Sequence, residues 1–326
     1  MRIHIQNDEE DRLFTITPAQ WAEAAARAPD IGAGHDVSFG RTDADFTAAM
    51  AQAEALVTAA RIVHERFPAP APRLKLIFCT SAGLDRLAPF DFLPDGAALL
   101  NNRGTHGEKA GEYAIMALLM LAARVPAFAT AQREQRWAPY HASVLRGRRL
   151  IVVGLGALGG AAAEQAARFG MVVTGVRANP APHPACARVI GTDALDAALP
   201  EAEFLLLACP LTDATRNLLN RRRIGLLPVG AGVVNIGRGA LLDQDALCDA
   251  LDSGTLSGAV LDVFTPEPIP PGHRLWATPN LIITPHVSAD DPATYNPRSL
   301  DIFLENLRAL RDGRPLPNRV DPARGY

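Results

Sequence analysis

The sequence is poor in cysteine and has no long apolar run. Its four cysteines, Cys79, Cys186, Cys209 and Cys248, show neither CxxC spacing nor a repeated interval, which disfavours a disulfide framework or a cysteine metal site. We expect them to be buried small apolar residues. The longest nearly apolar stretch, residues 113–123, is far below the roughly 20 residues that cross a bilayer, so no membrane helix is expected.

An excess of charge of either sign is also missing. The net charge is -3 at pH 7, which gives no general attraction to phosphate backbones or anionic membranes and argues against a nucleic-acid partner. No basic-then-apolar leader follows Met1, so we expect a cytoplasmic protein. The histidines show no HExxH spacing, and we expect no metal site.

The chain has 326 residues, of which 48% are hydrophobic, and this length and apolar content are enough for two domains. Strand and helix patterns alternate along it, which predicts mostly parallel sheets covered by helices. The first series has strand patterns at residues 2–5, 35–39, 54–58, 74–80 and 97–100, and helical patterns at 18–28 and 61–67. After a helical pattern over 108–123 and a polar turn region with Trp137 and Pro139, the second has strand patterns at 150–153, 172–176, 204–207, 232–235, 258–263 and 281–284. A last helix is expected over 300–310 and should pack on the first domain.

A glycine-rich turn opens the second series. Gly154, Gly156 and Gly159 form a GxGxxG pattern directly after the strand pattern 150–153 and before a helical pattern over 160–169. In that context the first glycine permits the tight turn, the second lets a pyrophosphate approach, and the third lets the helix pack on the sheet. The helix N-terminus would then hold the phosphates of a dinucleotide. The alternative is a tight turn with no ligand.

The next strand pattern bears on which dinucleotide binds. NAD-binding turns of this kind usually have an acidic residue about 20 positions on, which bonds the adenosine ribose. Here Arg177 stands in that place, and no Asp or Glu occurs in residues 171–192. Because a guanidinium pairs with the 2'-phosphate of NADP, we favour NADP(H) over NAD(H). Alternatively, Arg177 only stacks on the adenine or faces solvent.

Three polar residues follow strand patterns of the second series, where ligands bind in open α/β sheets. Arg238 lies in NIGRG, Glu267 in DVFTPEP and His286 in TPH. Taken singly, each has an ordinary structural explanation. Taken in this order after GLGALG, the four segments resemble the D-isomer-specific 2-hydroxyacid dehydrogenase family over most of residues 74–326. The ending, PLPNRVD with Gly325 and Tyr326, is similar to that of NADP-preferring glyoxylate and hydroxypyruvate reductases of this family.

The chemistry of the three residues fits that resemblance. Reduction of a 2-oxo acid needs a hydride at the carbonyl carbon and a proton at the carbonyl oxygen. His286 is the candidate proton donor, because imidazole exchanges protons near neutral pH. A nearby carboxylate favours the protonated imidazole, and we expect Glu267 to supply it. Arg238 would hold the substrate carboxylate and polarise the carbonyl.

The resemblance also implies an architecture. A Rossmann-type doubly wound parallel-sheet domain, residues 102–287, would be inserted into a flavodoxin-like α/β catalytic domain made of residues 1–101 and 288–326. The active site would lie in the cleft between the two domains, and the partners would be a small 2-oxo acid and a second copy in a homodimer.

Further site residues follow from the resemblance. The backbone of Ala82 and Gly83 would receive the substrate carboxylate together with Arg238. Trp276 would shape the substrate pocket or lie in the core, and Trp137 is more ambiguous, since its counterpart in some relatives reaches a neighbouring subunit's substrate. The cofactor-binding set is Gly154, Gly156, Ala157, Leu158, Gly159, Arg177, Cys209, Pro210, Thr215, Ile236, Gly237, Asp262 and His286.

Two other functions stay open. A phosphoglycerate-type dehydrogenase is one, although we see no room for the regulatory domain common there and little basic charge near Gly83. The other is a dinucleotide-sensing binding protein without turnover. A sensor does not need Arg238, Glu267 and His286 together, so we predict hydride transfer between NADP(H) and a small 2-oxo acid, with glyoxylate or hydroxypyruvate first.

Overall fold

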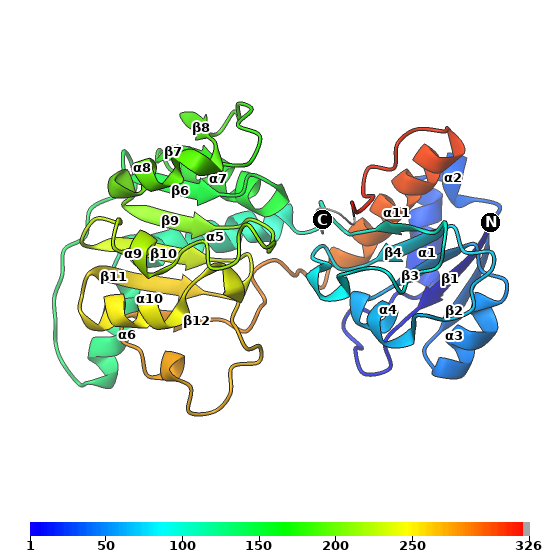
Figure 1. The fold of residues 1–326 in the computed structure, drawn as a ribbon, viewed down its shortest axis with the longest axis horizontal. Helices are drawn as coiled ribbons and strands as arrows, with labels where there is room; N and C mark the ends of the chain where they lie inside the picture. Colours follow the sequence, from blue (N-terminus) through cyan, green and yellow to red (C-terminus); the bar gives the residue numbers. More distant parts are fainter. Residues whose placement is uncertain (322–326) are drawn as a thin grey trace. The chain divides into compact units, whose positions relative to one another are not determined.

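The computed structural model describes residues 1–321 and divides the chain into two compact units (Figure 1). Unit 1 combines Met1–Thr105 with the segment that begins at Asp291, and unit 2 is His106–Asp290. The sequence feature at Gly325 and Tyr326 lies outside the described residues.

Unit 1 is built on a five-stranded parallel sheet with the order β2-β1-β3-β4-β5. This is the flavodoxin-like order, as expected. The strands are β1 Arg2–Gln6, β2 Asp36–Gly40, β3 Ala55–Thr58, β4 Leu76–Cys79 and β5 Ala98–Leu100. The helices are α1 Pro18–Arg27, α2 Pro29–Gly32, α3 Asp43–Met50, α4 Ala60–Arg66, the 3-10 turn η1 Asp85–Leu87, and α11 Tyr295–Arg311.

The last helix completes the core of unit 1. α11 packs against α1 and α2, and its buried Phe303 lies between the rings of Trp21 and Phe78, with centroids 6.4 Å and 5.5 Å away. This helix begins at Tyr295, five residues before the predicted start at Leu300. Its early turns carry Asn296 and Ser299, which are buried polar residues and do not give an apolar helical pattern.

Unit 2 has a seven-stranded parallel sheet with the order β12-β11-β10-β9-β6-β7-β8. The strands are β6 Arg149–Val153, β7 Val172–Val176, β8 Arg188–Ile190, β9 Phe204–Leu207, β10 Ala231–Asn235, β11 Leu256–Leu261 and β12 Leu281–Ile283. The α-helices are α5 Gly107–Ala122, α6 Val125–Arg133, α7 Ala157–Arg168, α8 Leu195–Ala198, α9 Arg221–Ile224 and α10 Gln244–Asp252. Short 3-10 turns are η2 Thr192–Ala194, η3 Leu199–Glu201, η4 Gly239–Leu241 and η5 Arg274–Trp276.

The strand order of unit 2 reverses between β6 and β9. In doubly wound sheets a ligand binds outside the carboxyl ends of the strands at this point. Two buried apolar clusters cover the two faces of the sheet, and α5 packs closely on α7. A Cβ at Gly111 of α5 would lie 3.3 Å from the Ala161 carbonyl, so the absence of a side chain there permits the approach. The predicted fold class is confirmed.

Some local predictions were wrong. Helix α6, Val125–Arg133, which has Pro126 in its first turn, was not predicted. The polar turn region that was expected after α5, with Trp137 and Pro139, lies beyond α6 and outside any helix. β8 was not predicted, because its three residues are an edge strand with little buried surface. Helix α3 was also missed, although Thr42 and Asp45 form a capping box at its start. The helix after the glycine turn begins at Ala157, three residues before the predicted start.

The described chain holds no single helix long and apolar enough to cross a membrane; α5 and α6 pass that test only as a pair, across a 63° bend.

Cys79, Cys209 and Cys248 are buried as predicted, whereas Cys186 is half-buried.

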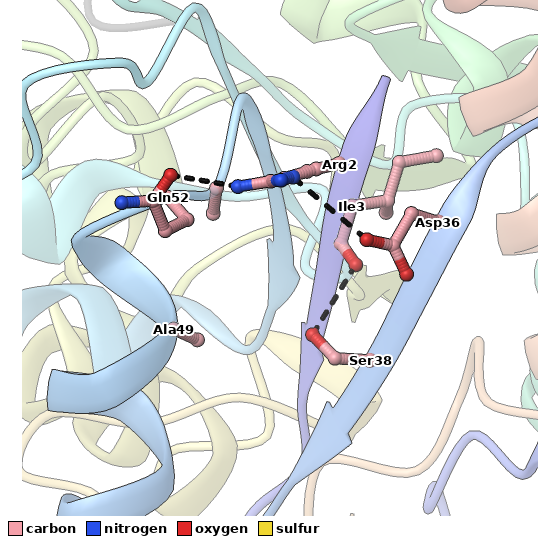
Figure 2. A pocket seen from close by; sticks show the side chains of 7 residues that line it. Arg2, Ile3, Asp36, Ser38, Ala49 and Gln52 are labelled. Carbon is pink, nitrogen blue, oxygen red and sulfur yellow. Dashed lines mark hydrogen bonds and ion pairs between the residues drawn. The ribbon is translucent and has the colours of Figure 1, made fainter.

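A shallow cavity of about 160 Å³ lies in unit 1 between β1, β2 and the end of α3 (Figure 2). Arg2 and Asp36, which line it, are the first residues of their strands, and Arg2 Nε lies 3.8 Å from Asp36 Oδ2. The cavity therefore lies at the amino edge of this sheet, opposite the edge at which parallel sheets bind ligands.

Candidate active site

The glycine turn leaves β6 at the reversal of the strand order. Gly154 has φ +93°, and a Cβ there would come within 2.5 Å of the Cys209 backbone. A Cβ on Gly159 would lie 1.7 Å from the Gly154 carbonyl oxygen. Both positions therefore need glycine. Gly154 needs it for the dihedral angle and for the close approach of the segment after β9, and Gly159 needs it so that α7 can pack against the turn.

Gly156 differs from the other two, because a Cβ there would meet no atom of the described chain within 4 Å. The space over Gly156 is thus open, and it lies at the N-cap of α7, which has no side-chain cap. Helical amides at this end, from Ala157 to Gly159, have no intrahelical acceptor. Open space, unpaired amides and the positive end of a helix dipole fit the pyrophosphate of a dinucleotide.

Arg177 follows β7 and is half-buried. Its Nη2 donates to the carbonyls of Ala181 and Pro182, the second at 3.3 Å, so the guanidinium is held against the loop after β7. Its Nε is buried and has no hydrogen-bond partner among the described residues. Arg177 therefore stands at the carboxyl edge next to the glycine turn, on the strand adjacent to β6.

The remaining predicted cofactor residues follow β9 and β10. Cys209 packs on Gly154, and burial raises the pKa of its thiol to about 11. Thr215 folds back on this segment, since its Oγ1 donates to the Pro210 carbonyl at 2.7 Å. Ile236 is buried, and a Cβ on Gly237 would lie 3.0 Å from the Cys209 carbonyl. These segments form one edge of unit 2, beside the glycine turn.

Arg238 follows β10 and is half-buried. Its Nη1 donates to the Gly237 carbonyl at 2.8 Å, and its own carbonyl accepts from Asn235 Nδ2 at 2.9 Å. A Cβ on Gly239 would lie 2.0 Å from the Phe264 carbonyl carbon, so the missing side chain lets the loop after β10 touch the loop after β11. The segment carrying Arg238 is thereby held against the segment that leads to Glu267.

Glu267 and His286 meet across the loops after β11 and β12. His286 Nδ1 lies 2.5 Å from Glu267 Oε1, and the two side chains are 45% and 23% exposed. A carboxylate only accepts hydrogen bonds, so Nδ1 carries a proton and Nε2 is the nitrogen left for chemistry. Among the described residues no hydrogen bond reaches Nε2. The contact therefore makes His286 and Glu267 a candidate acid–base pair, with Nε2 as the nitrogen that could exchange a proton.

Asp262, the first residue after β11, is fully buried. Its Oδ1 accepts the Val287 amide and its Oδ2 the Ser288 amide, each at 2.9 Å, while its carbonyl accepts the His286 amide at 2.9 Å. The residue was predicted to contact a cofactor. In this structure its carboxylate anchors the segment that carries His286, and a contact with nicotinamide stays a prediction.

Sequence reasoning gave no role to His106, which precedes α5. It is buried, and its Nδ1 lies 3.2 Å from the Ala289 carbonyl and 3.4 Å from Asp290 Oδ1. Burial lowers the pKa of His106, and the charges of Arg238 and His286 lower it further, against the opposing effect of Asp290. Arg238 and His286 are thus each within electrostatic reach of His106. No spacing in the sequence signals this, because five residues separate His106 from the end of β5.

The predicted substrate residues Ala82 and Gly83 belong to unit 1. They follow β4 in a segment that the buried Asn102 holds, with Asn102 Nδ2 donating to the Thr80 carbonyl at 2.8 Å and Asn102 N donating to the Ser81 carbonyl at 3.1 Å. Within the described chain the amides of Ala82 and Gly83 donate no hydrogen bond.

Both tryptophans considered for the site are exposed. Trp276 is 54% exposed, which excludes the core alternative, and its Nε1 donates to the Pro270 carbonyl at 3.0 Å. Trp137 is 94% exposed in the segment after α6.

Comparisons with known proteins agree with this geometry. A family model described as the NAD binding domain of D-isomer specific 2-hydroxyacid dehydrogenases matches residues 115–288. Glyoxylate/hydroxypyruvate reductase A of Serratia proteamaculans is 31% identical over 260 residues, covering 78% of this chain and 82% of that protein. D-3-phosphoglycerate dehydrogenase of Mycobacterium tuberculosis is 30% identical over 283 residues, covering 85% of this chain but 53% of that protein.

Solved structures give the same result. A D-isomer specific 2-hydroxyacid dehydrogenase from Xanthobacter autotrophicus, in complex with NADPH and MES, superposes with a TM-score of 0.82. It is 30% identical, and the match covers 99% of each chain.

Proposed function

The chain belongs to the D-isomer-specific 2-hydroxyacid dehydrogenase family, and we propose that it reduces glyoxylate or hydroxypyruvate with NADPH. Members of this family act on small 2-oxo and 2-hydroxy acids. The observation that carries the proposal is the Glu267–His286 contact of 2.5 Å, on the same sheet edge as Arg238 and the glycine turn.

The glycine turn and the loops after β9 and β10 are the proposed cofactor site. The open space at Gly156 and the amides of Ala157, Leu158 and Gly159 would hold the pyrophosphate. Cys209 with Pro210, and Ile236 with Gly237, would wall the site. When bound, the nicotinamide supplies or accepts the hydride.

His286 is the proposed proton donor and acceptor. Glu267 holds Nδ1 in its protonated form and orients the ring, so that Nε2 gives a proton to the carbonyl oxygen in reduction and takes one from the hydroxyl in oxidation. The Glu267 charge stabilises the imidazolium that reduction requires. The pair thus serves both directions of one reaction.

Arg238 is the proposed ligand of the substrate carboxylate and carbonyl oxygen. Its planar guanidinium can donate two parallel hydrogen bonds to a carboxylate, which lysine cannot do. The same cation stabilises the negative charge that develops on the carbonyl oxygen during hydride transfer. The unused amides of Ala82 and Gly83 support their proposed role in binding the substrate carboxylate, and the exposed Trp276 supports a place for its ring at the substrate pocket.

NADP(H) is the proposed cofactor. Arg177 supports it, since it takes the place at which NAD-binding turns have an acidic residue, and so does the NADPH bound to the Xanthobacter neighbour. Arg177→Ala should raise the KM for NADPH about tenfold or more, because a charge-assisted hydrogen bond is lost, and change the KM for NADH less than twofold. Arg168→Ala is the matched control, because Arg168 is the last residue of α7 and lies at the end away from the glycine turn. Equal effects on NADPH and NADH would contradict the role.

A homodimer joined through unit 2 is also proposed. Met116, Leu119 and Phe128 on α5 and α6 are 41%, 42% and 38% exposed, which supports a covered face. Sedimentation equilibrium should give twice the chain mass, and a monomer at micromolar concentration would contradict it.

The deciding experiment compares oxidation of NADPH and NADH against glyoxylate, hydroxypyruvate, pyruvate, longer 2-oxo acids and phosphohydroxypyruvate. We expect the highest kcat/KM with NADPH and one of the first two acids. Preference for phosphohydroxypyruvate would instead favour a phosphoglycerate-type dehydrogenase. Cofactor binding without turnover of any acid would favour a dinucleotide sensor.

A further inference from the structure

The backbone of His286 is held in an uncommon conformation. Its φ is +55°, in the left-handed region, which is unfavourable for a residue with a side chain and persists only where surrounding contacts impose it. The His286 amide donates to the Thr284 carbonyl at 3.1 Å, and the other backbone contacts come from one residue. Asp262 accepts the amides of His286, Val287 and Ser288 through its carbonyl and its two carboxylate oxygens. The direction in which His286 points therefore depends on where the Asp262 carboxylate lies.

The Asp262 carboxylate is itself held by a chain of hydroxyl groups. Thr284 Oγ1 donates to Asp262 Oδ1 at 2.5 Å, and Tyr113 OH lies 2.6 Å from Thr284 Oγ1. A hydroxyl has one proton, and a carboxylate can only accept, so the Thr284 proton goes to Asp262. Tyr113 must then be the donor to Thr284. The order of donation is Tyr113 to Thr284 to Asp262.

Burial favours this direction of donation. Tyr113 is 7% exposed in the middle of α5, and desolvation raises the pKa of its hydroxyl to about 12. The phenol therefore keeps its proton throughout the range in which the enzyme would work. Asp262 is fully buried, so its charge needs every donor that reaches it.

We propose that Tyr113 is a positioning residue for His286. Tyr113 acts by donating a hydrogen bond to Thr284, which fixes the Asp262 carboxylate, and this carboxylate in turn holds the backbone of residues 286–288. Tyr113 touches neither His286 nor Glu267 in this role. It couples α5 to the loop after β12, across 171 residues of sequence. The inference rests on the proposed function, because it takes His286 as the residue that moves the proton.

The first test removes single hydroxyl groups. Tyr113→Phe keeps the ring and should lower kcat about tenfold, with the KM for cofactor changed less than twofold, since a misplaced acid affects the chemical step more than binding. Thr284→Val should lower kcat about thirtyfold or more, because it leaves the buried Tyr113 hydroxyl without its partner and removes one of the donors to the Asp262 carboxylate. Thr284→Ser keeps the hydroxyl and should restore kcat to within about threefold of wild type. Tyr140→Phe is the matched control at a 52% exposed phenol, and should leave kcat unchanged.

The second readout does not depend on turnover. Imidazole NMR signals of His286 in the cofactor-free protein, assigned through a His286→Asn variant, should shift in Tyr113→Phe and in Thr284→Val but stay in place in Tyr140→Phe. If no 2-oxo acid is reduced, the proposed function fails while these signals still test the coupling. Unchanged His286 signals in Tyr113→Phe, or a raised KM for cofactor with kcat intact, would overturn the inference.

Discussion

In unit 1 the buried His4 has both ring nitrogens bonded inside the protein, Nδ1 to Ser38 Oγ and Nε2 to Gln6 Oε1, each at 2.9 Å. In unit 2 His286 has one nitrogen bonded, to Glu267, and its side chain is 45% exposed. Burial lowers the pKa of His4 despite the Gln6 hydrogen bond and the charge of Asp45. One histidine is therefore a neutral structural residue, whereas the other keeps a ring nitrogen that bonds to no described residue.

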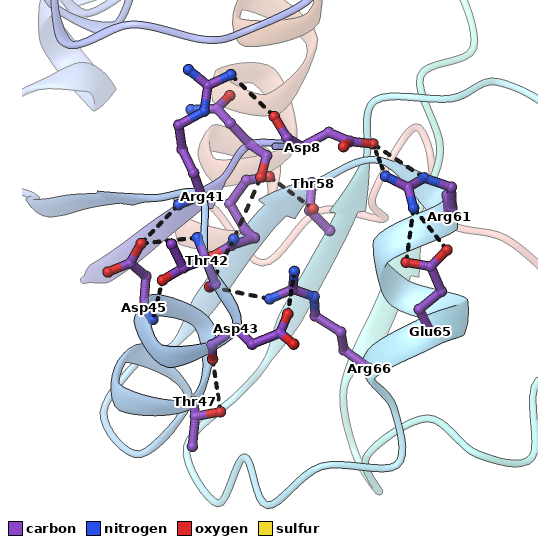
Figure 3. A network of polar contacts seen from close by, with 12 residues as sticks. Asp8, Arg41, Thr42, Asp43, Asp45, Thr47, Thr58, Arg61, Glu65 and Arg66 are labelled. Carbon is purple, nitrogen blue, oxygen red and sulfur yellow. Dashed lines mark hydrogen bonds and ion pairs between the residues drawn. The ribbon is translucent and has the colours of Figure 1, made fainter. Parts of the chain in front are cut away.

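The carboxyl edges of the two sheets differ in the same way. In unit 1 the strand order reverses between β1 and β3, and the chain's own charges gather there (Figure 3). Arg61 pairs with Asp8 and, at 2.8 Å, with Glu65, and Arg66 pairs with Asp43 at 2.6 Å. In unit 2 the corresponding place holds the glycine turn and the open space over Gly156. The carboxyl edge of unit 1 is thus occupied by its own ion pairs, whereas that of unit 2 leaves open space at Gly156.

The largest effect should separate the two histidines. His286→Asn removes the proposed acid but keeps a residue that tolerates positive φ, so the loop is retained. We expect kcat/KM for 2-oxo acid reduction to fall by roughly a thousandfold, the middle of the range for lost general acid catalysis. His4→Gln, measured by the same steady-state assay, should change kcat/KM less than threefold. Similar losses of kcat/KM in both variants would contradict the different roles given to His286 and His4.

The next largest difference should be between the kinetic effects of replacing Arg238 in unit 2 and Arg66 in unit 1. Arg238→Gln removes the proposed carboxylate ligand and should lower kcat/KM by about a hundredfold or more, because a charge-assisted bond and transition-state stabilisation are lost together. Arg66→Gln removes an ion pair that has its partner in unit 1, and it should leave both kcat and KM within about twofold. Wild-type kinetics in Arg238→Gln would remove this residue from the site.

Within the glycine turn, two substitutions of equal size should have opposite consequences. Gly156→Ala meets open space, so the thermal midpoint should change little while the Kd for NADPH rises about tenfold, since the methyl group takes room meant for the ligand. Gly159→Ala would collide with the Gly154 carbonyl and should lower stability or prevent folding. Fluorescence titration with NADPH and thermal melts measure the two effects. A lowered thermal midpoint in Gly156→Ala would contradict the claim that the space over Gly156 is open.

The smallest effect concerns unit 1 alone. Hydrogen bonds from the Arg41 and Thr42 amides hold the pKa of Asp45 at about 2. Because this value lies below that of an unfolded aspartate, about 3.9, the stabilisation is present above about pH 4 and is lost as pH falls toward 2. Wild type should exceed Asp45→Asn in urea resistance at pH 6, and the difference should shrink below pH 4. A constant difference would show that another group is responsible.

The sequence predicted well where burial alone decides. All strands but β8 were predicted, because most are buried apolar runs like β9. The contact between Glu267 and His286 was also predicted, because parallel strands bring their ends to one edge. The roles of these two residues and of Arg238 stay predictions. The sequence could not predict β8, whose residues are half-exposed, or the contact between Tyr113 and Thr284. That contact depends on how α5 lies on the sheet, which no spacing in the sequence records. The anchoring role of Asp262 was missed for the same reason.

The interrupted layout of unit 1 has a consequence for biosynthesis. A chain leaving the ribosome presents β1 to β5 first, but Phe303 and its helix, which fill the centre of that unit, are translated last. Unit 2 is one uninterrupted stretch, so all of its residues emerge before the earlier unit can close. The part that begins first thus waits, with apolar sheet surface uncovered, for the final helix, and in the nascent protein it is the part that most needs chaperone protection.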